Sequence, residues 1–269
     1  MILFDGNKIK PSEFPDKTPC FQSVPVTKGV HYRIRWYYES MDELITLIML
    51  AAHIYDNGAY STLYMPYVPN ARMDRVHSPH EIFTLRHFCN TINSLSFQGV
   101  HILDPHSYVT PALIDRVVVH SAEPYINHAL SLVIEKHRSR PFIVYPDDGA
   151  AKRYSLDVCD AVYGVKKRDW DTGRIEGLML NGRIPTNRPA LIVDDICSYG
   201  GTFARTAKEL KKAGVEHIYL YITHCEKHIY DGELIRDHLV DGVFTTNSIM
   251  LDGGNDITVF PLKEGFDIV

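Results

Sequence analysis

The sequence lacks several features that mark particular classes of protein. None of its apolar runs reaches the roughly 18 residues that a membrane-spanning helix needs. Its start has neither the basic residues nor the apolar stretch of a signal peptide. The five cysteines are scattered, odd in number and without a C-x-x-C pair, so they indicate reduced thiols rather than disulfides or a zinc site. We therefore expect a soluble, cytoplasmic protein without a membrane segment.

Positive charge is not in excess either. The chain has 28 lysines and arginines against 33 aspartates and glutamates, which gives a formal net charge of −5. A nucleic-acid-binding protein usually presents a broad basic face, so we expect no nucleic-acid partner. Hydrophobic residues make up 45% of the 269-residue chain, which is enough for two modest cores.

Segments with strand and helix patterns alternate along the chain. We expect strands at residues 20–26, 31–37, 60–65, 100–103, 142–145, 161–166, 189–193 and 216–223. We expect helices between a cap at Ser40 and Gly58, at about 79–95, and from 201 to about 213. Ser40 and Glu43 have the S-x-x-E form of a capping box that would begin the first helix, and Gly58 can end it. This alternation predicts an α/β fold with largely parallel sheets flanked by helices.

A basic segment broken by proline, residues 135–141, is the expected division between two domains. It separates residues 1–138 from residues 139–269, and each half repeats the α/β pattern. In sheets of this kind, ligands bind beyond the carboxyl ends of the strands.

The strongest motif lies in residues 190–202, A-L-I-V-D-D-I-C-S-Y-G-G-T. An apolar strand leads to two adjacent carboxylates, Asp194 and Asp195, and a glycine turn then opens a helix. Paired carboxylates suit the 2′ and 3′ hydroxyls of a ribose. The free N–H groups and partial positive charge of a helix amino terminus suit a phosphate. The simpler interpretation, in which the acids only cap the helix, leaves two adjacent acids without a ligand, which is costly.

The pattern D-D-x-x-x-x-G-G-T after an apolar strand resembles the phosphoribosyl-pyrophosphate motif of type I phosphoribosyltransferases and ribose-phosphate pyrophosphokinases. The resemblance implies two tandem type I phosphoribosyltransferase-like domains. It also implies a set of ribose-phosphate-binding residues: Asp194, Asp195, Ser198, Tyr199, Gly200, Gly201 and Thr202. This motif alone does not separate the two families.

Four further segments resemble the pyrophosphokinases only. Residues 65–75, M-P-Y-V-P-N-A-R-M-D-R, are similar to the family's P-Y-x-x-Y-A-R-Q-D-R loop. This implies that Arg72, Asp74 and Arg75 belong to an ATP-binding loop in which the arginines hold the phosphates. Met73 replaces the usual glutamine, so one polar contact is lost. Without the resemblance, the loop would be a solvated turn with incidental arginines.

The second segment, L-D-P-H at residues 103–106, resembles the family's D-L-H, in which the histidine binds ATP and its magnesium. His106 takes that role only by resemblance, because magnesium prefers oxygen ligands and a lone histidine is usually structural. Residues 144–153, V-Y-P-D-D-G-A-A-K-R, resemble S-P-D-x-G-G-A-K-R. The match implies that Asp147 lies near a second cation or the acceptor sugar.

The fourth segment is Lys166-Lys167-Arg168, which resembles the K-x-R of a flexible catalytic loop. Lys166 and Arg168 would neutralise transition-state charge as that loop closes. On spacing alone, the three residues would be a surface charge cluster. A weaker match, E-F-P-D at residues 13–16, resembles the family's F-x-D-G-E adenine contact and gives Phe14 and Asp16. In the family a neighbouring subunit completes the adenine pocket, so a homo-oligomer, a dimer or a hexamer, is expected.

Together these resemblances imply an ATP-dependent diphosphokinase. It would transfer the β,γ-pyrophosphoryl group of Mg-ATP to the anomeric hydroxyl of a phosphorylated ribose and release AMP, with Mn²⁺ as a substitute for Mg²⁺. Two alternatives remain open: a type I phosphoribosyltransferase, and a non-catalytic regulatory subunit of a pyrophosphokinase assembly.

Tyr199 bears on the identity of the acceptor. The family usually has threonine at this position, in the loop around the 5′ phosphate. A tyrosine ring can stack on a base beyond that phosphate, or it can simply point to solvent. A 5′-substituted ribose such as ADP-ribose therefore stays open beside ribose 5-phosphate.

Overall fold

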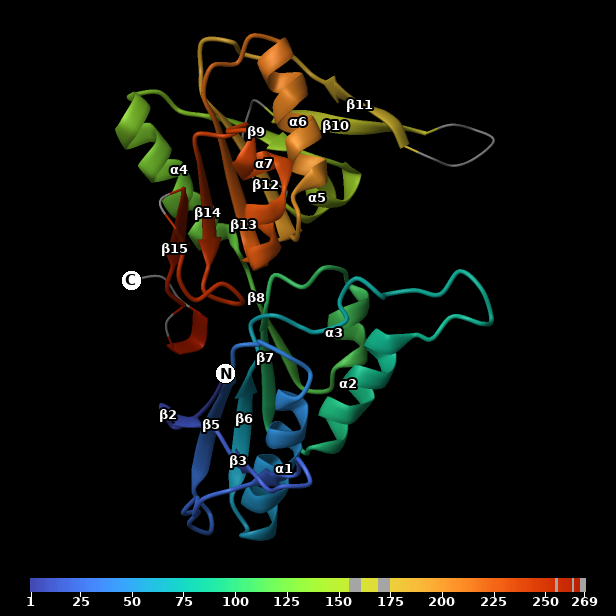
Figure 1. The fold of residues 1–269 in the computed structure, drawn as a ribbon, viewed down its shortest axis with the longest axis vertical. Coiled ribbons are helices and arrows are strands. Elements are labelled where there is room, and N and C mark those ends of the chain that lie inside the picture. The colour runs from blue at the N-terminus through green and yellow to red at the C-terminus, as the bar shows by residue number, and fades with distance from the viewer. Residues whose placement is uncertain (155–160, 169–174, 255, 263, 267–269) are drawn as a thin grey trace. The chain divides into compact units, whose positions relative to one another are not determined.

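The computed structural model describes residues 1–154, 161–168, 175–254, 256–262 and 264–266 (Figure 1). The chain divides into two compact units. Unit 1 comprises Met1–Ser121 with Glu264–Phe266, and unit 2 begins at Ala122. The sequence analysis placed the division later, at residues 138 and 139. Helix α4 (Glu123–His137) accounts for the difference, because His137 Nε2 lies 2.7 Å from Tyr219 Oη and the helix therefore packs on unit 2.

Unit 1 is built on a six-stranded sheet with the order β2-β1-β5-β6-β7-β8. The strands are β1 (Ile2–Phe4), β2 (Asn7–Ile9), β5 (His31–Trp36), β6 (Tyr60–Tyr64), β7 (Gly99–Leu103) and β8 (Val117–His120). Strands β5 to β8 run parallel, and β1 runs antiparallel to both β2 and β5. A separate two-stranded hairpin consists of β3 (Ser12–Glu13) and β4 (Pro19–Cys20).

Three helices accompany this sheet: α1 (Glu43–Asp56), α2 (Thr84–Ser94) and α3 (Val109–Leu113). In α1, apolar residues at helical spacing are buried against the strands, including Leu47, Leu50 and Ile54. Phe88 of α2 joins the same core, which also holds Trp36. One hydrophobic core thus ties the helices to the sheet of unit 1.

Unit 2 is built on a seven-stranded sheet with the order β11-β10-β9-β12-β13-β14-β15. The strands are β9 (Phe142–Tyr145), β10 (Ala161–Arg168), β11 (Ile175–Asn181), β12 (Ala190–Cys197), β13 (Ile218–Cys225), β14 (Gly242–Thr246) and β15 (Ile257–Phe260). All neighbours pair in parallel except β10 and β11. The other elements are α5 (Asp148–Arg153), α6 (Gly201–Lys212), η1 (Lys227–Asp231) and α7 (Glu233–Arg236), while η2 (Glu264–Phe266) belongs to unit 1. The expected α/β class with largely parallel sheets is confirmed.

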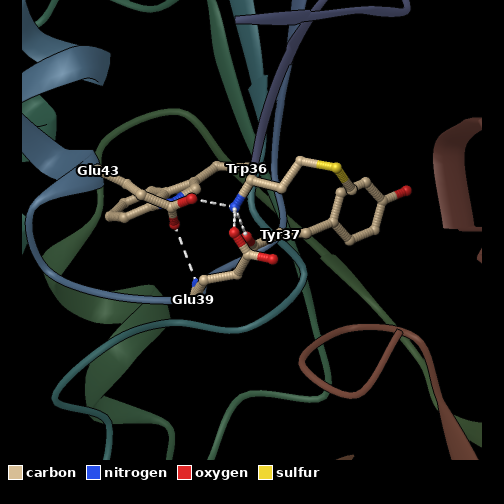
Figure 2. A network of polar contacts seen from close by, with 5 residues as sticks. Trp36, Tyr37, Glu39 and Glu43 are labelled. Atoms are coloured by element: carbon tan, nitrogen blue, oxygen red, sulfur yellow. Dashed lines mark hydrogen bonds and ion pairs between the residues drawn. The ribbon is translucent and has the colours of Figure 1, made fainter. Parts of the chain in front are cut away.

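The expected capping box at the start of α1 is wrong. The helix begins at Glu43, its cap residue is Asp42, and no side chain caps it. The Glu43 carboxylate has other partners. It accepts a hydrogen bond from the Glu39 amide at 3.0 Å (Figure 2) and another from Trp36 Nε1 at 2.8 Å. The amino group of Met1 also contacts this carboxylate. The Glu43 carboxylate therefore forms hydrogen bonds within the turn between β5 and α1 and does not close a capping box.

Several element boundaries differ from expectation. At residues 20–26 only Cys20 lies in a strand, because Pro25 has no N–H to donate and the flanking valines pack on the core instead. Helix α2 begins at Thr84 rather than near residue 79, after a turn in which Glu81 accepts the amide of His77 at 2.6 Å. Gly58, with a φ of 69°, follows the end of α1 as expected. Within the described residues, no helix is both long and apolar enough to cross a membrane.

Candidate active site

The two adjacent carboxylates of unit 2 lie inside β12 rather than beyond its end. The sequence analysis ended this strand at Val193, but β12 continues through Asp194 and Asp195 to Cys197. Asp194 is in register with Ile222 of β13, and the Asp195 amide donates a hydrogen bond of 2.9 Å to Asp194 Oδ1. The pairing with β13 therefore fixes the backbone that carries both acids.

Arg153, at the last position of α5, contacts both acids. Its Nη1 lies 2.5 Å from Asp195 Oδ1 and 3.7 Å from Asp194 Oδ1. Burial raises the pKa of Asp194 well above its usual value, and the negative charges of Asp195 and Asp147 add to this effect. The sequence analysis quoted Arg153 within a family-like segment but assigned it no role. Its contact with β12 could not be read from that segment.

Asp147 caps the amino terminus of α5. Its Oδ1 accepts hydrogen bonds from the amides of Gly149 and Ala150 at 3.0 and 3.1 Å. Its charge nevertheless contributes to the raised pKa of Asp194, so the structure brings Asp147 into the same electrostatic field as the β12 acids.

A divalent cation fits the unit 2 carboxylates by charge and by donor type. Carboxylate oxygens are the ligands that Mg²⁺ prefers. Burial raises the pKa of Asp194 first, and the charges of Asp195 and Asp147 raise it further; a cation would offset these charges. The imidazole of His106 in unit 1 fits Mg²⁺ less well. Among the residues that the structure describes, no three His, Cys, Asp or Glu side chains form a ready-made metal site.

Residues 198–202, named here the glycine loop, connect β12 to α6. Gly200 has a φ of 77° and caps α6, so the chain turns sharply before the helix. Gly201 and Thr202 form the first turn of this 12-residue helix. The helix amino terminus therefore follows directly after the β12 carboxylates, with free N–H groups and a partial positive charge.

The segment of η1 and α7 supports the glycine loop from outside. A Cβ added to Gly232 would lie 1.9 Å from the carbonyl oxygen of Tyr199, so only glycine permits this close approach. A Cβ on Gly200 would meet Leu234 of α7 at 3.4 Å. The position of the loop is thus set by elements that follow it in the chain.

Tyr199 lies at the exposed surface of the glycine loop beside a second aromatic ring. Its side chain is 57% exposed, and its ring centroid lies 5.1 Å from that of His228 in η1, at an interplanar angle of 44°. His228 Nδ1 also lies 3.6 Å from Glu226 Oε2. The sequence analysis missed His228, because nothing in its local pattern sets it apart from the other histidines.

In unit 1, the expected ATP loop and His106 come close together. Asp74 is buried, and its carboxylate pairs with Arg75 through contacts of 2.9 and 3.3 Å. The hydrogen bond from Arg75 lowers the pKa of Asp74, and Ser107 and His106 lower it further. Arg72 is exposed on the same loop. Asp74 is thus buried within the loop of residues 65–75 (named here the basic loop) and binds Arg75, whereas Arg72 and Arg75 are exposed.

The backbone of this loop is held at the carboxyl ends of β6 and β7. The amide of Met65 donates to the carbonyl of His101 at 2.8 Å, and the amide of Leu103 donates to the carbonyl of Pro66 at 3.1 Å. These two bonds join the segment that leads to Arg72 and the segment that leads to His106. Both therefore leave the sheet of unit 1 at neighbouring strands.

Phe14 and Asp16 lie in the exposed turn between β3 and β4. Phe14 is 52% exposed, and Asp16 Oδ1 accepts hydrogen bonds from the amide and the hydroxyl of Thr18 at 3.0 and 2.7 Å. These bonds lower the pKa of Asp16. Within one chain, the carboxylate is thus occupied in shaping the turn while the phenylalanine ring faces outward.

Lys166 and Arg168 occupy the last part of β10. The backbone of Lys166 is in register with Leu178 of β11, and that of Arg168 with Ile175, with an irregularity between Lys167 and Arg168. The strand thus runs two residues past its expected end. Residues 169–174, expected to form the rest of a catalytic loop, lie outside the described residues.

No protein-family model matches the chain. The ribose-phosphate pyrophosphokinase of Sulfolobus acidocaldarius is 27% identical over 209 residues, which cover 76% of this chain and 70% of that protein. The enzyme of the same name from Saccharolobus solfataricus is 26% identical over 232 residues, covering 82% and 77%.

A solved structure supports the fold. The phosphoribosylpyrophosphate synthetase of Mycobacterium smegmatis superposes with a TM-score of 0.76 at 17% identity, over 95% of this chain and 86% of that one. In sequence and in fold, this chain is thus similar to ribose-phosphate pyrophosphokinases.

Proposed function

We propose that the chain transfers the β,γ-pyrophosphoryl group of ATP to the anomeric hydroxyl of a phosphorylated ribose and releases AMP. One observation carries this proposal: two adjacent carboxylates in β12, the partly buried Asp194 and the buried Asp195, are followed by the glycine loop and the amino terminus of α6. The carboxylates of Asp194 and Asp195 accept hydrogen bonds from the 2′ and 3′ hydroxyls. The loop amides and the helix terminus bind the 5′ phosphate.

The proposal assigns the nucleotide to unit 1. Arg72 and Arg75 hold the ATP phosphates, and the pairing of Arg75 with Asp74 sets the direction of its guanidinium. His106 lies beside this loop. Phe14 and Asp16 of a second copy complete the adenine pocket, so the active protein is a homo-oligomer, a dimer or a hexamer.

In the proposed reaction, the sugar O1 attacks the β-phosphorus in line, the bond between O1 and that phosphorus forms, and the bond to the AMP oxygen breaks. Mg²⁺ or Mn²⁺ ions held by His106 and by Asp147 would supply positive charge to the phosphate oxygens. Asp194 and Asp195 orient the ribose so that O1 points toward ATP. Lys166 and Arg168 supply positive charge to the transferring group. No covalent enzyme intermediate is required, since positioning and charge neutralisation carry the step.

The acceptor extends beyond the 5′ phosphate in this proposal. The exposed ring of Tyr199, paired with His228, offers an aromatic surface beside the loop that binds this phosphate. A 5′-substituted ribose such as ADP-ribose carries a base that can stack there, whereas ribose 5-phosphate does not. We therefore expect use of ADP-ribose at least comparable to that of ribose 5-phosphate.

Product analysis with a panel of acceptors tests the proposal. The protein is incubated with ATP and MgCl₂, together with ribose 5-phosphate, ADP-ribose or no acceptor, and the nucleotides are separated by chromatography. AMP that appears only with an acceptor supports diphosphoryl transfer. A phosphoribosyltransferase would instead release pyrophosphate from phosphoribosyl pyrophosphate and a base, and a non-catalytic subunit would do neither.

A further inference from the structure

We infer that Arg153 is a positioning residue for the sugar acceptor: its guanidinium holds Asp195, and through it the pair with Asp194, in the arrangement that the ribose hydroxyls meet. This inference rests on the proposed function of the same site. It adds a residue that neither the sequence motif nor the comparisons assign.

The position of Arg153 is set by the elements around it. Strand β9 lies next to β12, with Ile143 in register with Leu191, and α5 follows β9 directly. The hydroxyl of Tyr145 donates a hydrogen bond to the carbonyl of Tyr154, which fixes the end of α5 to its strand. The guanidinium also lies 5.7 Å from the centre of the Tyr154 ring. Arg153 therefore has little freedom to leave β12.

The charges of the three groups indicate what Arg153 does. The side chains of Arg153, Asp194 and Asp195 are 19%, 15% and 4% exposed, so water screens their interaction weakly. Two carboxylates on consecutive residues repel each other when both are ionised. One guanidinium at 2.5 Å from Asp195 offsets about one of the two negative charges. Paired hydroxyl donors of a ligand, or a cation, would add to this offset.

The same contacts fix the directions of the carboxylate oxygens. Arg153 holds Asp195 Oδ1, while the Asp195 amide holds Asp194 Oδ1 at 2.9 Å. Each acid thus has an oxygen in contact with a neighbouring group of the protein. A diol that approaches the pair meets oxygens that are already oriented, so little rotamer entropy is lost on binding. Without Arg153, Asp195 would turn away from its neighbour, and the pair would lose this arrangement.

A purely structural ion pair is the competing explanation. Breaking a buried pair by removing one partner destabilises a protein whether or not the pair touches a ligand. Stability alone therefore cannot distinguish the two roles. A selective loss of affinity for the acceptor, with affinity for ATP retained, is the observation that a structural role does not produce.

The experiment compares Arg153→Met and Arg153→Lys with wild type. Arg236→Met is the matched control, because Arg236 forms an exposed ion pair of 3.1 Å with Asp237 on the surface of unit 2. Isothermal titration measures binding of ribose 5-phosphate and of ADP-ribose in MgCl₂ without ATP. Steady-state kinetics then give the KM values for acceptor and ATP.

The inference predicts a graded result. Arg153→Met weakens acceptor binding about 30-fold, and the KM for ATP stays within about threefold of wild type. Arg153→Lys keeps a positive charge but lacks the width of a guanidinium, so it weakens acceptor binding only about fivefold. The control variant binds the acceptor as wild type does.

Other outcomes overturn the inference. If folded Arg153→Met binds the acceptor as tightly as wild type does, Arg153 has no positioning role. If Arg153→Met does not fold, acceptor binding by Arg153→Lys provides the test. Unchanged acceptor affinity in the lysine variant then contradicts the inference. If wild type neither binds an acceptor nor forms AMP, the proposed function fails, and the inference fails with it.

Discussion

Lys166 and Arg168 stand apart from the other site residues because their proposed role belongs to the transition state rather than to binding. Both lie at the end of β10, directly before residues 169–174. Charge that develops during transfer is stabilised only in the transition state, so loss of such a contact lowers kcat more than it raises KM.

Replacing Lys166 or Arg168 by alanine is expected to lower kcat by roughly 100-fold, about 2.7 kcal/mol of transition-state stabilisation for each. The KM for the acceptor should change far less. Lys167→Ala, between the two, is the control and should keep most of its turnover. Near-normal turnover in both site variants, measured as AMP release, would move the catalytic role to other residues.

Tyr199 and His228 are expected to set the preference between acceptors. A stacked base contributes about 1–3 kcal/mol, which corresponds to roughly 5- to 150-fold in affinity. Tyr199→Thr should therefore shift kcat/KM toward ribose 5-phosphate and away from ADP-ribose, and His228→Ala should shift it in the same direction by less. If the ratio of the two kcat/KM values is unchanged in both variants, this aromatic pair does not contact the acceptor.

At the scale of residues, the sequence predicted groups that are adjacent in the chain and missed those that meet only in the fold. Asp194, Asp195 and the glycine loop are consecutive, so their chemistry was visible in one motif. Arg153 contacts Asp195 across two neighbouring strands, and His228 meets Tyr199 from a separate 3₁₀ helix. Sequence spacing carries no information on such contacts. Only the folded structure shows that these residues meet.

At the scale of elements, the position of the glycine loop depends on the segment of η1 and α7. Gly232 has a φ of −84°, which any residue can adopt, so the need for glycine here is steric rather than conformational. Its backbone packs directly against Tyr199. A side chain at this position would therefore displace the loop without straining its own backbone.

Gly232→Ala is expected to raise the KM for the acceptor about tenfold, because the added methyl group displaces the Tyr199 carbonyl. The KM for ATP should stay near its wild-type value. Gly242→Ala is the control, since its Cβ would meet Tyr219 at an ordinary distance of 3.5 Å. Equal acceptor KM values in Gly232→Ala and wild type would show that η1 and α7 do not support the loop.

The β5–α1 turn of unit 1 offers a test of stability. Burial raises the pKa of Glu43, but hydrogen bonds from the Met1 amino group, the Glu39 amide and the Trp36 indole outweigh it, so the pKa lies below its usual value. A carboxyl whose folded pKa is depressed stabilises the fold above its unfolded pKa of about 4.3. That stabilisation is lost as the pH falls through the folded pKa.

Glu43→Ala should therefore lower the free energy of unfolding of unit 1 by about 1–3 kcal/mol at pH 7, since the buried Trp36 indole loses its acceptor. Urea unfolding at pH 7 and at pH 3 measures the effect. The difference between wild type and variant should shrink at the lower pH. A difference that stays the same at both pH values would mean that the charge of Glu43 contributes nothing.

Helices and strands were predicted correctly where the spacing of apolar residues marked them. The prediction failed where a side chain had hydrogen-bond partners that its sequence neighbours did not indicate. The apolar spacing of α1 and the buried run of β12 predicted these elements well. The start of α1 was wrong because Glu43 binds Trp36 and Glu39 instead of closing a capping box. The four-residue strand β8 (Val117–His120) is only partly buried and was missed, whereas the fully buried four-residue strand β9 was predicted.

At the scale of the whole molecule, two units of similar α/β architecture divide the proposed work. Unit 1 carries the basic loop and His106, and unit 2 carries the carboxylates and the glycine loop. The fold class and the presence of two units were predictable from the alternation of patterns along the chain. The placement of α4 was not, because it depends on contacts with β13 and β15, which lie far along the chain.

The proposal that a second copy completes the adenine pocket predicts self-association. Light scattering at assay concentration should give at least a dimer, and Phe14→Ala should raise the KM for ATP by about fivefold or more, through loss of an aromatic contact. A fully active monomer would remove Phe14 and Asp16 from the site.

The central claim is that the β-phosphorus of ATP, and not the γ-phosphorus, is attacked. Phosphorus-31 NMR of a reaction containing ATP, MgCl₂ and the acceptor measures this directly. We predict that AMP accumulates in equal amount with a new diphosphate ester on the anomeric carbon of the ribose, and that no ADP is formed from ATP. Formation of ADP together with a singly phosphorylated acceptor would contradict the account, because it would show simple γ-phosphoryl transfer.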